Sequence, residues 1–421
     1  MNYPDSVQFL YALGNEIKTA KLGLERIRTV LDALGRPQDR LAIVHVAGTN
    51  GKGSTCAMIA AGLQAAGCRT GLFTSPHLME PTERIRIGGQ PISSAEFAAV
   101  FDRVHAVVER LMAEGAVDMH TTYFETVTAM ALLAFADAAV GCVVLEVGLG
   151  GRLDATNVVT PELCAITPVD YDHEAFLGRS LEAIAGEKAG ILKPGVPAII
   201  ARQRPEAGRV IEARAAELGI EVQRTIDSPV EELHMTARES RFLYRGLRLT
   251  CPLAGEHQVE NACTAALALT ELEIRPQDIE TGIAAAQWPG RLELVSRRPD
   301  VILDGAHNPA GARALAAYID RFYANRRIHL VFGAMRDKAV DEIAGMLFPR
   351  AQRVIVTAPK QARALAPEAL REMADHPNVE VAETLEGAMA LLRGTPREDA
   401  IFITGSLFLV AEARAMLLPK E

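Results

Sequence analysis

The sequence lacks several features that mark secreted, membrane-bound or redox-active proteins. None of its six cysteines belongs to a C-x-x-C pair, and each lies in an apolar or helical stretch. We therefore expect reduced, buried thiols, which are typical of a cytosolic protein. No apolar run approaches the ~18 residues of a membrane span. The first residues also lack the basic start and long apolar run of a secretory signal. The sequence thus predicts a soluble, cytoplasmic protein that does not enter a membrane.

The chain also lacks a run rich in lysine and arginine, which a nucleic-acid-binding surface on an acidic protein would need. It carries 44 lysine and arginine against 53 aspartate and glutamate side chains, a net charge of −9 at pH 7. We therefore expect no nucleic-acid partner. An acidic substrate is compatible with this balance only if its binding site is locally basic.

What the sequence does contain is an ordinary globular composition, with 49% hydrophobic and 23% charged residues over 421 positions. At roughly 150 residues per domain, this length predicts two or three domains. Apolar runs alternate with helical patterns, as in a mostly parallel sheet covered on both faces. In the first half, strands are expected at 41–47, 69–75, 141–148 and 163–169, and helices at 52–66 and 124–138.

The alternation is interrupted and then resumes. Residues 240–253 predict a β-hairpin with Gly246 in its turn, and residues 257–272 predict a helix. The segment 287–300 contains two prolines, a glycine and the only tryptophan, Trp288, and predicts a linker. The elements expected after it are strands at 300–304, 328–333, 353–358, 379–383 and 400–405, and helices that begin near Pro309, Lys338, Pro367, Leu385 and Ser406.

The segment Val44–Thr55, VHVAGTNGKGST, is typical of a phosphate-binding loop between a strand and a helix. Glycines let backbone N–H groups converge on phosphate oxygens, and the helix N-terminus adds partial positive charge. The pattern G-x-x-x-x-G-K-[ST] is not matched strictly, because Val46 and Gly53 depart from it; a plain glycine-rich turn is the alternative. The residues assigned to ATP are Gly48, Thr49, Asn50, Gly51, Lys52, Gly53, Ser54 and Thr55.

The fold class that follows is α/β, with a P-loop-type, mostly parallel N-terminal domain at 1–287, a linker at 288–297 and a smaller Rossmann-like domain at 298–421.

Further motifs follow one another along the chain. They are GTNGKGS (48–54), TSPHL (74–78), ERIRI (83–87), YFE (123–125), EVGLGGRLDATN (146–157), DHEAFLG (172–178), GEKAGI (186–191), GEHQVENA (255–262), WPGRLE (288–293), DGAHNP (304–309) and ITGSLFLV (403–410). In this order they resemble the folylpolyglutamate synthases of the Mur ligase superfamily, some of which are also dihydrofolate synthases. The resemblance implies an ATP-dependent ligase in which ATP phosphorylates the carboxylate of a folate or dihydropteroate. The amine of L-glutamate then attacks the acyl phosphate, and catalysis depends mainly on positioning and charge neutralisation.

The resemblance also implies two magnesium sites. Glu146 ends an apolar strand, where a carboxylate is costly to bury unless it is paired or bound to metal; the family gives it, with Ser75, to the first magnesium. A structural salt bridge for Glu146 and a capping role for Ser75 are the alternatives. His173 is assigned to the second magnesium, although Mg²⁺ prefers oxygen ligands, so an orienting role stays open. Lys188 is expected to be carbamylated, with a surface lysine paired to Glu187 as the alternative.

Other residues receive roles only through the resemblance. Asn261, Arg291 and Asp304 are expected to contact the nucleotide, with Arg291 reaching phosphate as the domains close. His307 and Asn308 are expected to face nucleotide or glutamate, or else to stabilise a turn. The residues expected around the pterin substrate are the loop 22–26, Thr122, Tyr123, Phe124 and Glu125, with Arg84, Arg86 and Arg152 for its anionic groups. Phe124 is equally compatible with a core position, and Arg84 or Arg86 with a solvated strand.

Two other functions are alternatives. One is a Mur-type ligase acting on a UDP-muramyl precursor, but only 47 residues precede Gly48, which we expect to be too few for the additional UDP-binding domain of those enzymes. The other is a nucleotide-binding regulator without ligase activity, which would not need Glu146, His173 and Lys188 together. We expect a monomer that binds small molecules only.

Overall fold

The computed structural model describes residues 1–14 and 23–418. The chain divides into two compact units, which we describe separately. Unit 1 comprises residues 1–229, 244–247 and 260–286, and unit 2 comprises residues 230–243, 248–259 and 287–421. Within the described part of the chain, no helix combines the length and apolar character needed to cross a membrane. The predicted domains at 1–287 and 298–421, with a linker at 288–297 between them, stay a prediction.

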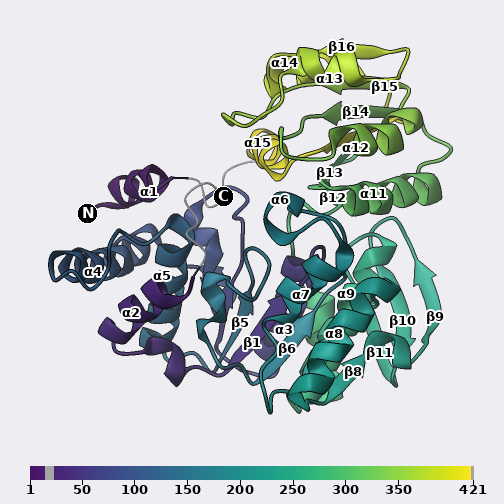
Figure 1. Cartoon of the computed structure of the whole chain (residues 1–421). Helices are drawn as coiled ribbons and strands as arrows, with labels where there is room; N and C mark the ends of the chain where they lie inside the picture. The colour runs from purple at the N-terminus through teal and green to yellow at the C-terminus, as the bar shows by residue number, and fades with distance from the viewer. Residues whose placement is uncertain (15–22, 419–421) are drawn as a thin grey trace. The chain divides into compact units, whose positions relative to one another are not determined.

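Unit 1 is built on an eight-stranded sheet in the order β4-β3-β2-β5-β1-β6-β7-β8 (Figure 1). Neighbouring strands in the series β2-β5-β1-β6-β7-β8 pair in parallel. At one edge, β3 pairs antiparallel with β2, and β4 pairs antiparallel with β3. The central strands are buried along their whole length, which explains their largely apolar sequences. The mostly parallel sheet predicted from the sequence is therefore confirmed. The strands are β1 (Ile43–Ala47), β2 (Thr70–Phe73), β3 (Ile85–Ile87), β4 (Gln90–Pro91), β5 (Cys142–Glu146), β6 (Leu163–Ile166), β7 (Ala198–Ile200) and β8 (Val222–Arg224).

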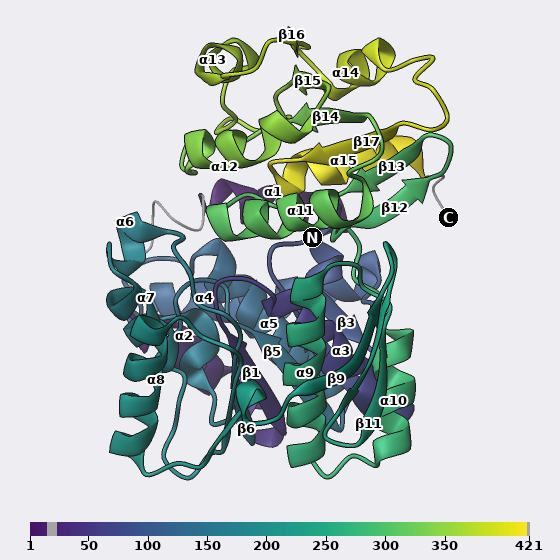
Figure 2. The same ribbon diagram turned by 90° about the vertical axis from the view of Figure 1, so that its right-hand side faces the viewer.

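Helices cover both faces of this sheet (Figure 2). On one face α3, α9 and α10 meet closely, because Gly62 of α3 leaves room for Leu269 of α9 and Gly282 of α10. Helices α2, α4 and α5 bury apolar side chains on the other face, around Ile43 and Phe73, and α7 and α8 continue the cover over β6 and β7. The helices of these segments are α1 (Tyr3–Ala12), α2 (Glu25–Ala33), α3 (Lys52–Ala65), α4 (Ser94–Ala113), α5 (Tyr123–Asp137), α6 (Glu174–Leu177), α7 (Leu181–Ala189), α8 (Pro205–Leu218), α9 (Glu256–Glu271) and α10 (Pro276–Ala285).

A three-stranded sheet contains the predicted hairpin. Strands β10 (Ser240–Tyr244) and β11 (Leu247–Cys251) are joined by Arg245 and Gly246, both of which have positive φ angles, +48° and +81°. Two consecutive left-handed residues are what a type I′ turn requires. Strand β9 (Val230–Met235) completes the order β11-β10-β9. The sequence analysis missed β9 because most of its side chains are exposed and no apolar alternation marks it.

Unit 2 contains a six-stranded sheet in the order β12-β13-β17-β14-β15-β16. Every strand predicted after residue 299 is confirmed, and these strands pair in parallel. The segment predicted as a linker also holds a strand, β12, which pairs antiparallel with β13 at the sheet edge. Prolines and glycine on either side of β12 obscured it in the sequence. The strands are β12 (Glu293–Ser296), β13 (Asp300–Leu303), β14 (Ile328–Phe332), β15 (Arg353–Val356), β16 (Val379–Val381) and β17 (Ala400–Thr404).

The helices of unit 2 begin at or within two residues of the predicted positions. Side-chain caps explain several of these starts: Asn308, Thr384 and Ser406 each accept a hydrogen bond from an amide of the first turn. Helices α11 and α12 bury their apolar faces around Phe332 and Phe402. The helices are α11 (Pro309–Phe322), α12 (Val340–Leu347), α13 (Pro367–Met373), α14 (Leu385–Leu391) and α15 (Leu407–Leu417).

Candidate functional site

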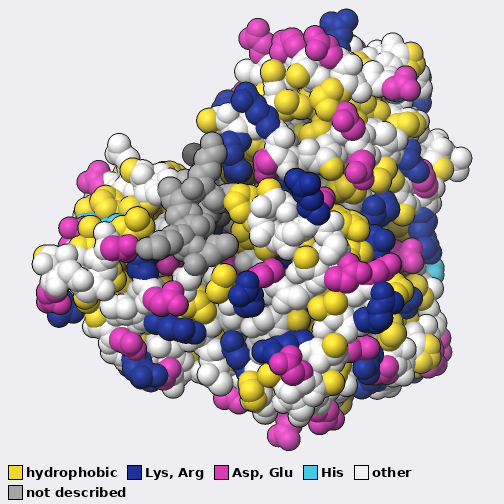
Figure 3. Space-filling model, in the orientation of Figure 1, with side chains coloured by type: hydrophobic (Ala, Val, Ile, Leu, Met, Phe, Trp, Pro, Cys, Tyr) yellow, Lys and Arg dark blue, Asp and Glu magenta, His cyan; other side chains and the backbone are white. Residues whose placement is uncertain are grey.

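Charged side chains of both signs are interspersed on the face drawn in Figure 3. With a formal net charge of −9, the protein as a whole repels anions. A phosphate or carboxylate substrate therefore needs a local group of cations and backbone amides. The residues that provide such a group lie at the carboxyl ends of the central strands of unit 1, where open α/β sheets bind their ligands.

The predicted phosphate loop connects β1 to α3. Two of its glycines have positive φ angles, +144° at Gly48 and +87° at Gly51, where other residues would be strained. Neither position has room for a side chain. A Cβ at Gly48 would lie 1.9 Å from Oγ1 of Thr167, and one at Gly51 would lie 2.2 Å from Oδ1 of Asn261 on α9. Asn261, which is expected to contact the nucleotide, therefore lies against the phosphate loop.

The loop is also held by backbone hydrogen bonds to the segment after β6. The amides of Thr49 and Asn50 donate to the carbonyl oxygen of Pro168, at 3.0 and 3.3 Å. The hydroxyl of Thr49 donates to the carbonyl oxygen of Asp170 and accepts from its amide. Because α3 begins at Lys52, the amides of its first turn have no acceptor within the helix and point along its axis. The loop is therefore held in place, and the first-turn amides of α3 suit an anion.

Two lysines meet at this loop. Nζ of Lys52 donates to the carbonyl oxygens of Gly48 and Thr49, both at 3.2 Å, and Nζ of Lys188 donates to that of Gly48 at 2.8 Å. Lys188 is only 4% exposed, so it is not a surface lysine. An ordinary surface lysine was expected to pair with Glu187, but Glu187 instead accepts a hydrogen bond from Arg152 at 2.8 Å. Burial, together with the charge of Lys52, lowers the pKa of Lys188 to about 7.

Glu146 and Ser75 lie together, as predicted. Glu146 ends β5, and its Oε2 accepts a hydrogen bond from the backbone amide of Ser75 at 2.9 Å. The carboxylate is 4% exposed, and its placement at the end of a parallel strand next to a hydroxyl residue fits a magnesium site of oxygen ligands.

His173 caps the short helix α6 in a left-handed conformation, with φ +53°. Its backbone amide donates to Oδ1 of Asp172 at 2.9 Å, and its Nε2 lies 3.8 Å from the same oxygen. Burial lowers the pKa of Lys188, and the negative charge of Asp172 partly opposes this shift. Asp172 is therefore a carboxylate at this site that the sequence analysis did not assign; its position next to His173, just after a strand, was the available signal.

A network under the site holds the loop 148–157. Oδ1 of Asp154 accepts hydrogen bonds from the amide and hydroxyl of Thr156, and the Thr156 hydroxyl contacts Nε2 of His45 on β1 at 2.9 Å. Burial raises the pKa of Asp154 and lowers that of His45 to about 3. Arg152, predicted to hold anionic substrate groups, is 58% exposed and forms an ion pair with Glu187. Its predicted contact with substrate stays untested.

The residues predicted around a pterin begin α5. The hydroxyl of Thr122 and the carboxylate of Glu125 form a capping box, and Oε2 of Glu125 also accepts from Arg26 at 2.7 Å. These two residues therefore fix the start of the helix. Residue 22 of the predicted loop 22–26 lies outside the described residues.

Of the two aromatic residues after the cap, Tyr123 is buried in the core and Phe124 packs against the core. Tyr123 stacks on Tyr11 with ring centroids 5.8 Å apart, and the guanidinium of Arg84 lies 4.9 Å from the centre of its ring. Phe124 packs against Phe73 and the edge of the core cluster. Arg84 is buried rather than solvated. Arg86, on β3, is half-buried, and burial lowers its pKa.

Within unit 2, the predicted site residues stabilise two turns. Oδ2 of Asp304 accepts from the amide of Leu292 at 2.9 Å and its Oδ1 from that of Ala306 at 3.0 Å; burial raises its pKa, and the charge of Arg291 opposes this. Nδ1 of His307 contacts the carbonyl oxygen of Gly305. Asn308 caps α11. Turn stabilisation, one of the two roles considered for the last two residues, is therefore observed.

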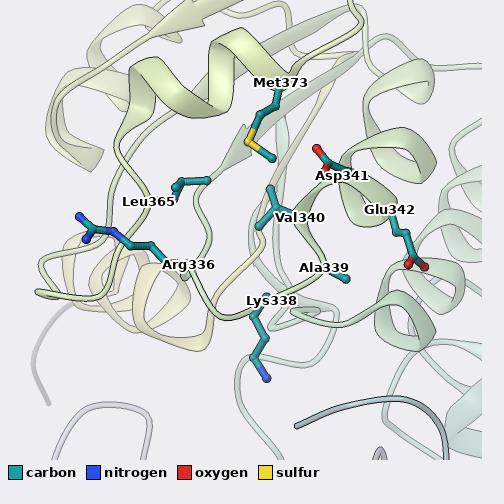
Figure 4. A pocket seen from close by; sticks show the side chains of 8 residues that line it. All are labelled: Arg336, Lys338, Ala339, Val340, Asp341, Glu342, Leu365 and Met373. Atoms are coloured by element: carbon teal, nitrogen blue, oxygen red, sulfur yellow. The ribbon is translucent and has the colours of Figure 1, made fainter. Parts of the chain in front are cut away.

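An open hollow of about 260 Å³ lies elsewhere in unit 2, after β14 and beside α12 (Figure 4). Figure 4 shows Arg336 and Lys338 pointing away from each other, with Asp341 and Glu342 on the opposite side. None of the predicted site residues lines it. Its mixed charges and open shape give no definite ligand chemistry.

Comparison with known proteins places almost the whole chain in one family. The Mur ligase middle domain matches residues 46–269, and the Mur ligase, glutamate ligase domain matches residues 290–407. Folylpolyglutamate synthase of Lacticaseibacillus casei is 36% identical over 433 residues and covers 99% of both chains. Dihydrofolate synthase/folylpolyglutamate synthase of Bacillus subtilis is 37% identical over 413 residues, covering 94% of this chain and 95% of the relative. The crystal structure of Mycobacterium tuberculosis folylpolyglutamate synthase complexed with ADP and AMPPCP has a TM-score of 0.92 at 34% identity, over 100% of each chain.

Proposed function

Because the chain belongs to the Mur ligase family, and within it to the folylpolyglutamate and dihydrofolate synthases, we propose that it adds L-glutamate to a folate carboxylate at the expense of ATP, and that dihydropteroate is a second acceptor. The observation that carries this proposal is the match with such enzymes along the whole chain. The same match disfavours a UDP-muramyl substrate. The amides of the phosphate loop and the charge of Lys52 supply the local positive charge that an acidic protein needs in order to bind ATP.

The reaction divides into two steps. In the first, the substrate carboxylate attacks the γ-phosphorus of ATP, giving an acyl phosphate and ADP. In the second, the amine of L-glutamate attacks the acyl carbon, and phosphate leaves as the amide forms. The amides of the first turn of α3 and the charge of Lys52 stabilise the phosphoryl oxygens as negative charge moves onto the leaving ADP. The rigid attachment of the loop to Pro168 and Asp170 keeps these donors in place.

Two magnesium ions complete the nucleotide site in our proposal. Glu146 and Ser75 would hold the first ion, and His173 would take part in the second, with Asp172 as a nearby carboxylate that suits Mg²⁺ better than an imidazole. Bound magnesium neutralises phosphate charge during transfer. The close contact between Ser75 and Glu146 supports the first assignment more directly than any contact supports the second.

We also propose that Lys188 carries a carbamate. A carbamate forms from a neutral amine and carbon dioxide, and burial already lowers the pKa of Lys188 to about 7. The modification would replace a cation next to Lys52 by an anion. It would thereby turn a repulsion between two lysines into an attraction, and it would offer oxygen atoms to magnesium.

The remaining assignments are part of the same proposal. Asn261, Arg291 and Asp304 would contact the nucleotide, and the substrate contacts would come from Thr122, Tyr123, Phe124, Glu125, Arg152 and His307.

We propose a cytoplasmic monomer. Its cysteines are all unpaired and mostly buried, as expected in a reducing compartment. The domain limits 1–287 and 298–421 complete this proposal.

The acyl-phosphate step can be tested with a folate whose terminal carboxylate carries heavy oxygen. The proposal predicts that one labelled oxygen appears in the released inorganic phosphate, and only when L-glutamate and ATP are both present. Amide formation without transfer of the label would contradict an acyl phosphate. Label in AMP instead of phosphate would point to adenylation and would also overturn it.

A further inference from the structure

Three potential metal ligands converge in unit 1, outside the nucleotide site. His105 and Glu109 lie one turn apart on α4, and His120 lies in the segment between α4 and α5. Nδ1 of His105 is 3.3 Å from Nε2 of His120 and 4.0 Å from Oε1 of Glu109. One ligand atom from each of the three residues lies within 4.8 Å of the other two.

The distance between the imidazoles fits a specific metal geometry. In tetrahedral zinc sites the Zn–N distance is close to 2.0–2.1 Å, so two coordinating nitrogens are about 3.3–3.4 Å apart. The observed separation of 3.3 Å therefore leaves room for one zinc ion between the rings. Glu109 is too far for a regular tetrahedron, but its side chain is 55% exposed and can move toward the ion by rotation about its own bonds.

His120 is also oriented as a metal ligand. Its Nδ1 lies 2.9 Å from the carbonyl oxygen of Thr121, and since a carbonyl only accepts, Nδ1 carries the proton. The lone pair is then on Nε2, the atom that faces His105. Zinc-bound histidines are typically fixed by such a hydrogen bond from the other ring nitrogen.

Aromatic rings hold both imidazoles in position. Phe101 stacks on His105 at 5.4 Å, and Phe9 of α1 contacts both rings edge-on, at 4.7 Å from His105 and 5.3 Å from His120. The two rings are thus held by apolar contacts. The side chain of Glu109, whose carboxylate lies 4.0 Å from His105, is exposed.

We propose that His105, Glu109 and His120 bind one Zn²⁺ ion, with water as the fourth ligand. The three residues join α4 to the segment that leads, two residues later, to Thr122 at the start of α5. Bound zinc would therefore stabilise the position of that helix start. A hydrogen bond between two neutral imidazoles is the alternative explanation for the 3.3 Å separation, and it needs no metal.

The test measures zinc binding to the full-length protein. The protein is first freed of metal and then placed in saturating Mg²⁺, which occupies the magnesium sites. Bound zinc is measured by equilibrium dialysis, and Co²⁺ substitution reports tetrahedral coordination through its visible absorption. The variants are Glu109→Gln and His120→Asn. The matched control is His234→Asn, which removes an exposed histidine of β9. Melting temperatures without metal show whether each variant is folded.

Wild type and His234→Asn should bind one more equivalent of zinc than His120→Asn and should give the tetrahedral Co²⁺ spectrum. Glu109→Gln should weaken zinc binding by about tenfold or more, and zinc should raise the melting temperature of wild type but not of His120→Asn. Equal zinc stoichiometry in wild type and His120→Asn would overturn the proposal. So would an unchanged affinity in Glu109→Gln, whose exposed side chain is not needed for folding.

Discussion

Lys52 and Lys188 donate hydrogen bonds to the same carbonyl oxygen, that of Gly48 in the phosphate loop. One lysine begins α3 and the other lies near the end of α7, 136 residues later. Burial lowers the pKa of Lys188 to about 7, and repulsion from the ammonium group of Lys52, which shares this acceptor, adds to the shift. The protein thus keeps a lysine that is readily neutral next to the site where ATP is proposed to bind.

The first prediction concerns this lysine. Lys188→Arg should lower turnover by roughly 10²-fold or more, because arginine keeps the charge but cannot form a carbamate and cannot offer oxygen atoms. Labelled carbon dioxide should give a carbamate resonance in wild type and not in the variant. The signal should decrease as pH falls through about 7, since the amine is then protonated. Lys360→Arg, at an exposed ion pair, is the control.

Lys188→Ala should be equally inactive, and a short carboxylic acid in solution should restore part of its activity by replacing the carbamate. If Lys188→Arg retains near-normal turnover, the carbamate is not required and Lys188 acts as an ordinary cation.

The second prediction concerns magnesium. Glu146→Gln keeps the shape of the side chain and an acceptor for the amide of Ser75, but it loses the negative charge. The magnesium concentration for half-maximal ATP turnover should rise by about tenfold or more. Glu217→Gln, in an exposed pair on α8, should leave it unchanged. A magnesium titration of Glu146→Gln that superimposes on wild type would show that Glu146 has only a structural role.

The third prediction compares two glycines of almost equal conformation. Gly51 and Gly67 have φ angles of +87° and +84°, so alanine at either position costs about 1 kcal/mol of stability through backbone strain. Only at Gly51 does the new methyl group meet a neighbour, Asn261. Gly51→Ala should therefore weaken ATP binding by about tenfold or more, whereas Gly67→Ala should bind ATP normally. Equal ATP affinities in the two variants would exclude close packing of the phosphate loop against α9.

The fourth prediction is a pH dependence of stability. His45 is fully buried, and burial lowers its pKa from 6.5 to about 3. Between these values the unfolded chain binds a proton that the folded protein does not. This group therefore contributes stability above about pH 6.5 that is lost as pH falls toward 3, by up to about 1.4 kcal/mol per pH unit.

The measurement compares wild type with His45→Gln, which keeps a polar partner for Thr156 but does not titrate. The difference in unfolding free energy should change between about pH 7 and 5 in the direction given above. His234→Gln, at an exposed position, provides the control. Parallel stability curves for wild type and His45→Gln would mean that His45 is protonated at the same pH in the folded and unfolded states.

Much of the fold could be predicted because it is encoded locally. The apolar strands, the glycine-rich loop before Lys52 and the hairpin turn at Gly246 are all marked by neighbouring residues. Strands β4, β7, β8, β9 and β12 were not predicted from the sequence. The first three are only two or three residues long, β9 is largely exposed, and prolines flank β12.

The site was only partly predictable, since its geometry depends on contacts between distant segments. Motifs indicated Glu146 and Ser75, but the hydrogen bond that joins them spans 71 residues. The ion pair between Arg26 and Glu125 spans 99 residues, and it gives Glu125 a structural role that the motif alone did not indicate. The shared acceptor of Lys52 and Lys188 likewise required the three-dimensional structure.

Product analysis tests the central claim most directly. The protein is incubated with ATP, Mg²⁺ and L-glutamate, together with tetrahydrofolate, dihydropteroate or a UDP-muramyl precursor in separate reactions, and the products are identified by mass. The account predicts that tetrahydrofolate gains glutamate, that dihydropteroate becomes dihydrofolate, and that one ADP and one phosphate form for each amide bond. Ligation of the UDP-muramyl precursor alone, or ATP hydrolysis without any amide product, would contradict it.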